Sequence, residues 1–262
     1  MRCDKCRDEA VFFQPNSGRH LCGRHLALDI ETRAKHSIRS HRWMSPGDHI
    51  AVLVSGDRKT AALLSFLKKL TADRRDIRLS AVPACGADTR GASRSSAMTV
   101  VESLRIPCIE MPLPGGSGTA AQEKVTKIAL AISLDDIAQG VLGQFLFGNA
   151  GRLMHPSSAG SGPLPVICPF IAVPSDELDL YWEIGGTGID LPPGIPARDT
   201  LPQETRAILE DYSRLHPATK YAILHLAEQL SSGDAAATAI AGATGPGTGE
   251  TKMSSPQKRP NS

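Results

Sequence analysis

The sequence predicts an α/β fold: a doubly wound, mainly parallel sheet, preceded by a small metal-binding module and followed by helices. Short apolar segments alternate with amphipathic ones over residues 49–184, as in parallel strands joined by right-handed helical crossovers. Cysteine and histidine are concentrated before residue 28, and two amphipathic helical patterns follow residue 202. Five segments are therefore expected: a metal-binding finger (1–28), a basic linker helix (29–48), the α/β domain (49–184), a helical segment (185–230) and a tail (231–262).

Composition excludes some classes of protein. The chain has 262 residues and a net charge of +2, so no global excess of charge indicates a polyanionic partner. No apolar run approaches the roughly 18 residues of a membrane span, and the N-terminus is polar rather than signal-like. The sequence therefore predicts a cytoplasmic protein with no membrane partner.

Four potential metal ligands lie near the N-terminus. Cys3-Asp-Lys-Cys6 and Cys22-Gly-Arg-His25 form two ligand pairs separated by a turn-rich stretch. Three thiolates and one imidazole suit tetrahedral Zn²⁺, and with no open position such a site is structural. The alternative is free thiols or a reducible disulfide, which a cytoplasmic compartment disfavours. We therefore expect the segment 1–28 to be a zinc finger.

The next segment is predicted to be a helix over residues 26–44. Its apolar residues recur about once per turn, and no acidic residue falls between Arg33 and Arg42. Arg33, Lys35, Arg39 and Arg42 are candidates for contact with RNA phosphates. A solvated helix face explains the same pattern equally well.

The stretch Val52–Leu64 predicts a strand, a tight turn and the start of a helix. In open α/β sheets such a joint directs backbone N–H groups and the positive end of the helix dipole toward an anion. Many similar joints bind nothing. The candidate phosphate-binding residues are Ser55, Gly56, Arg58, Lys59 and Thr60.

Further elements complete the predicted sheet and its helices. The expected strands are 50–54, 78–83, 107–111, 128–133 and 166–173, and the expected helices after 61–70 are 97–104, 120–127, 175–182, 203–215 and 220–230. Ser175 is the expected N-cap of its helix, and Leu178, Tyr181 and Trp182 are expected in the core. The tail 231–262 is rich in Ala, Gly, Thr and Ser, which predicts disorder.

Paired carboxylates occur where the strand 128–133 ends. Asp135 and Asp136 would lie at the carboxyl edge of the sheet, where they could hold Mg²⁺ or position a substrate. The alternative, which we weigh more heavily, is that one of them caps a helix beginning near Ile137.

Taken together, these elements resemble the PP-loop ATP-pyrophosphatases that thiolate tRNA, a family with an adenine nucleotide alpha hydrolase-like fold. The resemblance covers most of residues 1–230 and rests on the order and spacing of several motifs. These are the N-terminal zinc ligands, Val54-Ser-Gly-Asp-Arg-Lys-Thr60 (the family's SGGKDS loop), Ala131-Ile-Ser-Leu-Asp-Asp-Ile-Ala-Gln139 (its GHNLDDEAQ), Gly148-Asn149 with Arg152, and Ile167-Cys-Pro-Phe170 with Glu177 and Tyr181.

The resemblance implies an activity. Family members bind Mg²⁺-ATP at the loop and adenylate a uridine or cytidine carbonyl of tRNA, and sulfur then displaces AMP to give 2-thiouridine or 2-thiocytidine. The catalytic candidates are Lys59, Asp135 and Asp136. The resemblance also implies tRNA, an active paralogue or a sulfur-carrier protein as partners, with a homodimer as one oligomeric option.

The departures from the family pattern fall on its chemistry. Asp57 replaces a glycine that lets the backbone approach phosphate, and Lys59 replaces an acidic residue expected to help hold the metal. The thiolation cysteines are missing from 112–124 and 192–198, so no iron–sulfur cluster is expected. The remaining Cys85, Cys108 and Cys168 are expected to be buried structural thiols rather than catalytic ones.

Three hypotheses follow. The chain is a divergent tRNA sulfurtransferase, a non-catalytic paralogue that binds RNA or an active partner, or a nucleotide-binding module without further chemistry. The missing cysteines and the altered loop favour the second.

Overall fold

A computed structural model of the chain describes residues 1–83, 91–109, 124–148, 164–185, 187–194 and 203–230. Its centre is a four-stranded parallel sheet in the order β4-β3-β5-β6. The strands are β3 (His49–Val54), β4 (Arg78–Pro83), β5 (Lys127–Ala129) and β6 (Val166–Ile167). In β3, Val52 is opposite Ala81 on one side and Ala129 on the other. The predicted α/β class and parallel sheet are confirmed.

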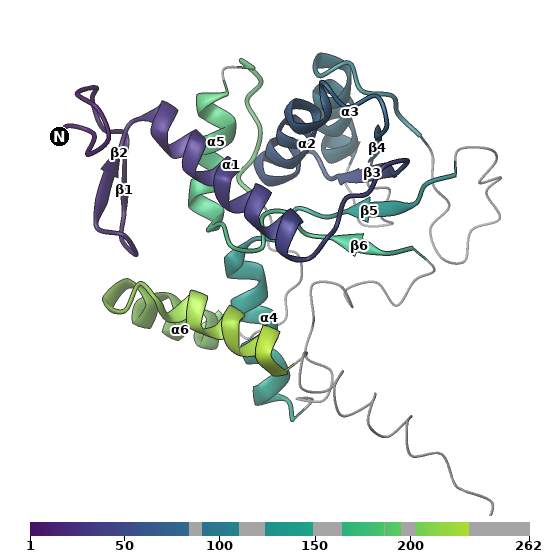
Figure 1. The fold of residues 1–262 in the computed structure, drawn as a ribbon. Helices are drawn as coiled ribbons and strands as arrows, with labels where there is room; N and C mark the ends of the chain where they lie inside the picture. Colours follow the sequence, from purple (N-terminus) through teal and green to yellow (C-terminus); the bar gives the residue numbers. More distant parts are fainter. Residues whose placement is uncertain (84–90, 110–123, 149–163, 186, 195–202, 231–262) are drawn as a thin grey trace, which may run out of the picture.

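Helices cover both faces of this sheet. Figure 1 shows α2 (Arg58–Thr71) and α3 (Gly91–Ser103) above the sheet and α4 (Leu134–Leu146) below it. This follows from the strand order: the chain leaves β3 toward β4 in one direction and β5 toward β6 in the other, so right-handed crossovers lie on opposite faces. The direction of winding changes between β3 and β5.

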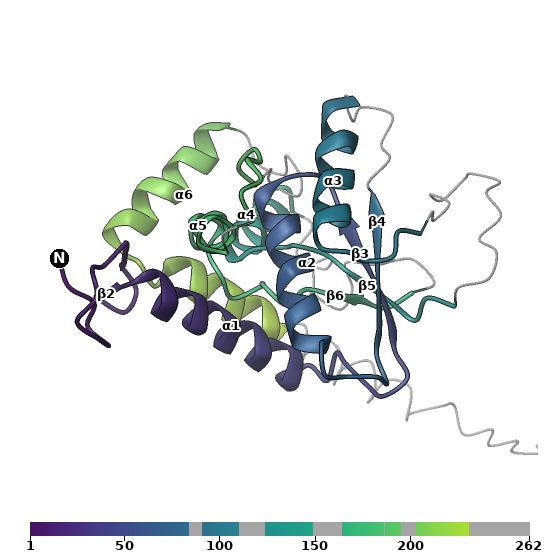
Figure 2. The same ribbon diagram turned by 90° about the horizontal axis from the view of Figure 1, so that it is seen from above.

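The remaining elements form two additions. A hairpin of β1 (Phe12–Gln14) and β2 (Arg19–Leu21) leads into α1 (Gly23–Ser40), which packs with α2 against α5 (Ser175–Ile184). In Figure 2 the hairpin lies at one end of α1, away from the sheet. Helix α6 (Gln203–Leu215) and a last helix over 219–230 follow.

One core joins these layers. It includes Leu26 and Ile30 of α1, Leu64 of α2 and Phe170, all at most 1% exposed. The predicted core residues Leu178, Tyr181 and Trp182 are buried, as expected. None of the helices within the described ranges has the length and apolar character needed to cross a membrane.

Several predicted elements are shorter than expected. The strand 166–173 ends at Ile167, because Pro169 cannot donate to a ladder and the chain turns there, with Val173 N–H bonding to the Phe170 carbonyl. The strand 107–111 is reduced to a parallel bridge between Ala81 and Cys108 in the part that is described. The strand 128–133 is β5 alone, ending at Ala129.

Two predictions of local structure are wrong. The predicted helix 120–127 does not form at its described end: residues 124–126 are irregular, and residue 127 begins β5. The N-cap of α5 is Pro174 rather than Ser175, whose N–H bonds to the carboxylate of Asp135. The tail 231–262, Asn149, Arg152 and Cys85 lie outside the described residues.

The other two isolated cysteines differ from each other. Cys168 is fully buried, as predicted, and burial raises the pKa of its thiol to about 12. Cys108 is exposed, so the expectation of a buried structural thiol is wrong there. It forms the short bridge with Ala81 at the edge of the sheet, where no further strand covers it in the described part.

Candidate metal centre and strand-end loop

The four predicted metal ligands converge. One atom from each of Cys3, Cys6, Cys22 and His25 lies within 4.8 Å of the other three. His25 Nδ1 is 3.5 Å from the sulfur of Cys3 and 3.3 Å from that of Cys22, and the sulfurs of Cys6 and Cys22 are 3.6 Å apart. Bonds of about 2.0–2.3 Å to one tetrahedral ion separate its ligands by roughly 3.5 Å. The cluster therefore fits a single four-coordinate metal ion.

Local structure brings these ligands together. The β1–β2 hairpin returns the chain to its start, where His20 donates its backbone N–H to the carboxylate of Asp4. Cys22 is the N-cap of α1, and His25 lies in its first turn. A thiolate at a helix N-terminus is stabilised by the positive end of the dipole.

The pKa values of two of these thiols diverge because burial, backbone hydrogen bonds and neighbouring sulfurs act on them in different balance. Burial alone would raise the pKa of Cys3, but hydrogen bonds from backbone N–H groups and from Cys6 lower it to about 6. For Cys6, a backbone hydrogen bond lowers the pKa, but burial and the neighbouring sulfurs of Cys22 and Cys3 outweigh it and raise the pKa to about 12. Neighbouring thiolates repel, and a bound cation removes this repulsion.

A second candidate site lies at the carboxyl ends of β3 and β5. Open α/β sheets bind ligands in the crevice where the winding direction changes, which here lies between these two strands. The β3–α2 loop begins at Ser55, and Gly56 has a φ of +82°, a left-handed conformation that suits glycine. The predicted phosphate-binding loop therefore lies at the expected edge of the sheet.

The anion position of this loop is taken by a side chain of the protein. Asp57 is the N-cap of α2, and its carboxylate accepts a hydrogen bond of 2.8 Å from Thr60 N–H and one of 2.7 Å from the Ser55 hydroxyl. It is only 3% exposed. A carboxylate at a helix N-terminus uses the N–H groups and dipole that would otherwise attract phosphate.

Lys59 bridges the crevice. Its ammonium group lies 2.9 Å from a carboxylate oxygen of Asp136, and the two side chains are 3% and 6% exposed. Asp136 is also the third residue of α4 and closes a capping box with Ser133, whose N–H and hydroxyl donate to it. Helix α4 therefore begins at Leu134 with Ser133 as its N-cap. The predicted N-cap at Asp135 or Asp136 and the start near Ile137 are wrong, although Asp136 does take part in capping this helix.

A segment over residues 189–194 covers this loop. Arg58 donates its Nε–H to the Leu191 carbonyl over 2.8 Å and its backbone N–H to the Pro192 carbonyl over 3.0 Å, and its guanidinium pairs with Glu183. Gly194 packs so closely that an added Cβ would lie 2.2 Å from Lys59 Cγ. The predicted nucleotide-binding residues Arg58 and Lys59 are thus both engaged with other parts of the chain.

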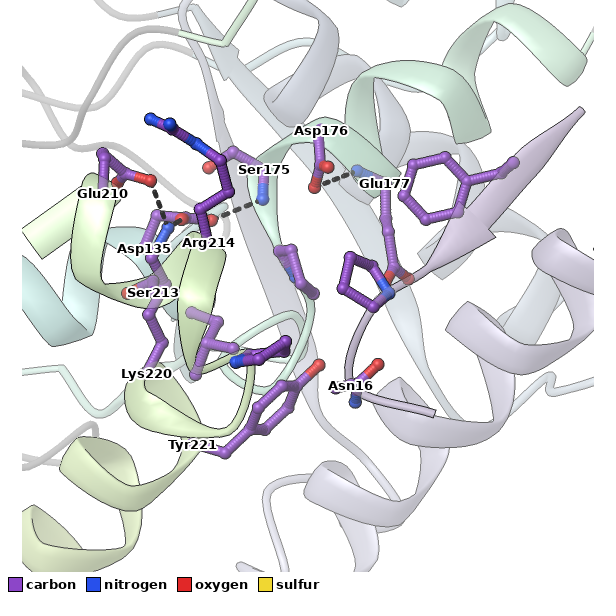
Figure 3. Close-up of a pocket in the computed structure, with 15 residues that line it drawn as sticks. Asn16, Asp135, Ser175, Asp176, Glu177, Glu210, Ser213, Arg214, Lys220 and Tyr221 are labelled. Carbon is purple, nitrogen blue, oxygen red and sulfur yellow. Dashed lines mark hydrogen bonds and ion pairs between the residues drawn. The ribbon is translucent and has the colours of Figure 1, made fainter. Parts of the chain in front are cut away.

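Asp135 points to a different place from Asp136. It pairs with Lys220 and accepts a hydrogen bond of 2.6 Å from Ser175 N–H. As Figure 3 shows, these groups border a pocket that also involves Glu210 of α6 and Asn16 of the hairpin turn. The pocket has a volume of about 460 Å³. The two predicted carboxylates therefore do not form one site.

The predicted RNA-contacting residues also separate. Arg33 points inward: it pairs with Glu177, which is 1% exposed, and lies 3.1 Å from Asp29. Burial raises the pKa of Glu177, although Arg33 opposes this effect. Arg39 and Arg42 are exposed, and Lys35 is half-exposed near Glu31. Arg33 therefore holds α1 against α5 and is not part of the exposed basic face.

Sequence reasoning missed the partners of these groups. Glu177 was matched as a motif residue but not as the partner of Arg33, and Lys220 and Gly194 were not singled out. Lys220 lies 85 residues from Asp135, and Arg33 lies 144 residues from Glu177. No local pattern signals such pairs.

Comparison with known proteins supports a common origin. Residues 2–27 match the family described as 2-thiouridine synthetase TtuA, N-terminal LIM domain. Cytoplasmic tRNA 2-thiolation protein 1 of Bos taurus is 26% identical over 275 residues, covering 87% of this chain and 77% of that protein. The protein of the same name from Drosophila grimshawi is 24% identical over 276 residues, covering 91% and 80%.

A solved structure has a similar fold. The U34-tRNA thiolase NcsA from Methanococcus maripaludis, described with its [4Fe-4S] cluster, superposes with a TM-score of 0.71 at 19% identity. The match covers 88% of this chain and 87% of that one. It shows that the two proteins share a fold.

Proposed function

Because the chain belongs to the PP-loop family of tRNA 2-thiolation proteins, we propose that it is a non-catalytic member, one that binds RNA or an active partner without using ATP. A single observation carries the proposal: the inherited nucleotide loop is filled by the protein's own charges. The carboxylate of Asp57 takes the anion position at α2, and the ammonium of Lys59 faces Asp136.

The energetics support this reading. For Mg²⁺-ATP to enter, Asp57 would have to give up two hydrogen bonds or tolerate a phosphate beside its carboxylate. Lys59 would have to release Asp136, and unpairing a buried ion pair costs on the order of 3–5 kcal/mol. Ordinary interactions of the nucleotide would have to offset both costs before any net binding resulted.

ATP binding is the direct test. Calorimetric titration of the full chain with ATP, with and without Mg²⁺, is expected to give no measurable heat of binding. No pyrophosphate should be released when tRNA and a sulfur donor are added. ATP-dependent pyrophosphate release would instead establish the divergent sulfurtransferase, and ATP binding without release would establish a nucleotide-binding module.

We propose that the N-terminal metal is a structural zinc ion. The donors are three sulfurs and one imidazole nitrogen at the spacing of ligands on a single ion. A [4Fe-4S] cluster would hold its four ligands farther apart, because each binds a different iron atom. Metal analysis of the purified protein should find zinc at one atom per chain, and stoichiometric iron with sulfide would contradict the assignment.

The remaining parts of the proposal follow from the family. The relatives are named cytoplasmic, which supports a cytoplasmic location for this chain. tRNA is the proposed nucleic acid, and an active paralogue or a sulfur-carrier protein is the proposed protein partner. The five segments predicted from the sequence remain the proposed domain boundaries.

A further inference from the structure

A basic hollow lies where α1 and α2 end. It has a volume of about 430 Å³ and four cationic residues around it: Lys35 and Arg39 from the last turns of α1, Arg42 just after α1, and Arg74 just after α2. Its apolar lining includes Ile38 and Met44. The sequence did not indicate Arg74, which lies 32 residues beyond Arg42 and is brought beside it by the packing of the two helices.

The charges of the basic hollow are only partly neutralised. Arg74 pairs with Asp76, and Lys35 lies 3.5 Å from Glu31. Within the described ranges, neither Arg39 nor Arg42 has an acidic side chain at ion-pair distance. The Nε–H of Arg39 donates to the Lys35 carbonyl over 3.2 Å, which leaves its two terminal amino groups, and Arg42 is exposed. A guanidinium can donate two parallel hydrogen bonds to one phosphate.

The backbone turns sharply at Arg42. This residue follows the C-cap of α1 with a φ of +52°, a left-handed conformation that glycine adopts without strain and arginine does not. Its N–H bonds to the Arg39 carbonyl, and Trp43 N–H bonds to the Ile38 carbonyl. Arg105, which also follows a helix, has a similar φ of +49°, so this conformation does not by itself mark an anion site. It does leave the carbonyls of Ile38 and Arg39 satisfied by backbone N–H groups, so they do not face an incoming anion unpaired.

We propose that the basic hollow binds the phosphodiester backbone of RNA, with Arg39 and Arg42 as the principal phosphate contacts. Cations that are separated from one another can contact successive phosphates of an RNA strand, and the apolar lining between them can contact the sugars. This proposal rests on the proposed function, and it specifies where RNA binds. Compared with the RNA-contacting residues expected from the sequence, the proposed RNA-binding surface excludes Arg33, which points inward, and includes Arg74.

The position of the basic hollow separates RNA binding from the inherited loop. Helix α2 begins beside the carboxyl end of β3 and returns to its amino end, so the two sites lie on opposite edges of the sheet. The six residues of β3 span about 20 Å. RNA can therefore bind at this edge without nucleotide in the loop, as a non-catalytic protein requires.

The test is RNA binding by the full chain as a function of salt. Fluorescence anisotropy with a labelled tRNA transcript would compare wild type, R39Q/R42Q and a control, R105Q/R214Q, between 50 and 200 mM KCl. The control makes the same change in charge at exposed arginines outside the hollow. Thermal unfolding of each variant checks that the fold is unchanged.

The expected result is a weaker salt dependence for R39Q/R42Q. Each lost phosphate contact lowers the slope of log K against log salt by roughly 0.7–0.9, so two contacts lower it by about 1.4–1.8. Over this fourfold range of salt, the wild type should therefore lose about tenfold more affinity than the variant. The control should behave as wild type.

Three outcomes would overturn the proposal. Equal affinities and slopes for wild type and R39Q/R42Q would place RNA elsewhere and leave the proposed RNA role intact. Failure of the wild type to bind RNA would remove both the site and the RNA role, without bearing on the ATP measurement. Competition by polyglutamate as strong as that by RNA would indicate an acidic protein partner instead.

Discussion

The buried pair of Lys59 and Asp136 should stabilise the protein measurably. Lys59→Met preserves the length of the side chain and its packing against Gly194 but leaves the carboxylate of Asp136 buried without its cation. Breaking a buried pair from one side costs about 3–5 kcal/mol. Asp136 still accepts hydrogen bonds from Ser133, so we expect a value near the lower end, about 3 kcal/mol.

A double-mutant cycle separates the pair from its surroundings. Asp136→Asn alone should cost about 3 kcal/mol, because it leaves the ammonium of Lys59 buried and unpaired. The double variant contains neither charge, so its cost should be at least about 2 kcal/mol less than the sum of the single costs. Urea unfolding curves with equal m-values provide the measurement. Additive costs, or a cost below about 1 kcal/mol for Lys59→Met, would refute the pair as described.

Three other predictions concern the loop, the α1–α5 contact and the metal. Asp57→Gly should give a measurable heat of ATP binding where the wild type gives none, because removing a charge and a side chain beside phosphate is worth roughly 1–3 kcal/mol. No detectable binding by the variant, or equal binding by both proteins, would contradict the role given to Asp57. Arg33→Met should lower the free energy of unfolding, measured by urea unfolding, by about 3–5 kcal/mol, because it leaves Glu177 buried without its cation. Lys35→Met should change this free energy by at most about 0.5 kcal/mol, because Lys35 is half-exposed. Equal effects of the two substitutions would refute an inward Arg33. Chelation of the metal should lower the unfolding temperature of the wild type. The unfolding temperature of Cys22→Ser should not change when the chelator is added. A Cys22→Ser protein with the stability and chelator response of the wild type would exclude this ligand set.

Local patterns predicted much of the fold because the relevant forces are local. The strands β3 and β4 were recognised from apolar runs, and β4 has the predicted bounds 78–83. The metal ligands were recognised because short spacings in sequence determine which side chains share a knuckle. Elements with few residues were predicted worst: β6 has two residues, and turn formation at Pro169 stops it before the apolar run ends.

The basic helix shows why exposure was harder to predict. Arg33 and Lys35 are two residues apart in one cationic run, yet one holds the buried Glu177 and the other is half-exposed. Periodicity places them on different sides of α1, but it does not reveal a buried carboxylate on α5. Only the packing of α1 on α5 assigns Arg33 its role.

The loop combines both kinds of information. Asp57 and Lys59 were visible in the sequence as departures, and the carboxylate of Asp57 acts locally by capping α2. Lys59 acts over 77 residues, on Asp136 across the crevice. A carboxylate at a helix N-terminus and an ammonium beside an aspartate reproduce the charges of phosphate and of a metal ion. Each substitution therefore supplies, from within the protein, a charge that a bound ligand would otherwise provide. Asp57 replaces the charge of the phosphate and Lys59 that of the metal ion. Asp57→Gly alone should therefore admit ATP, with an affinity that does not depend on Mg²⁺, because Lys59 still faces Asp136. Only the further change Lys59→Asp should make ATP affinity depend on Mg²⁺.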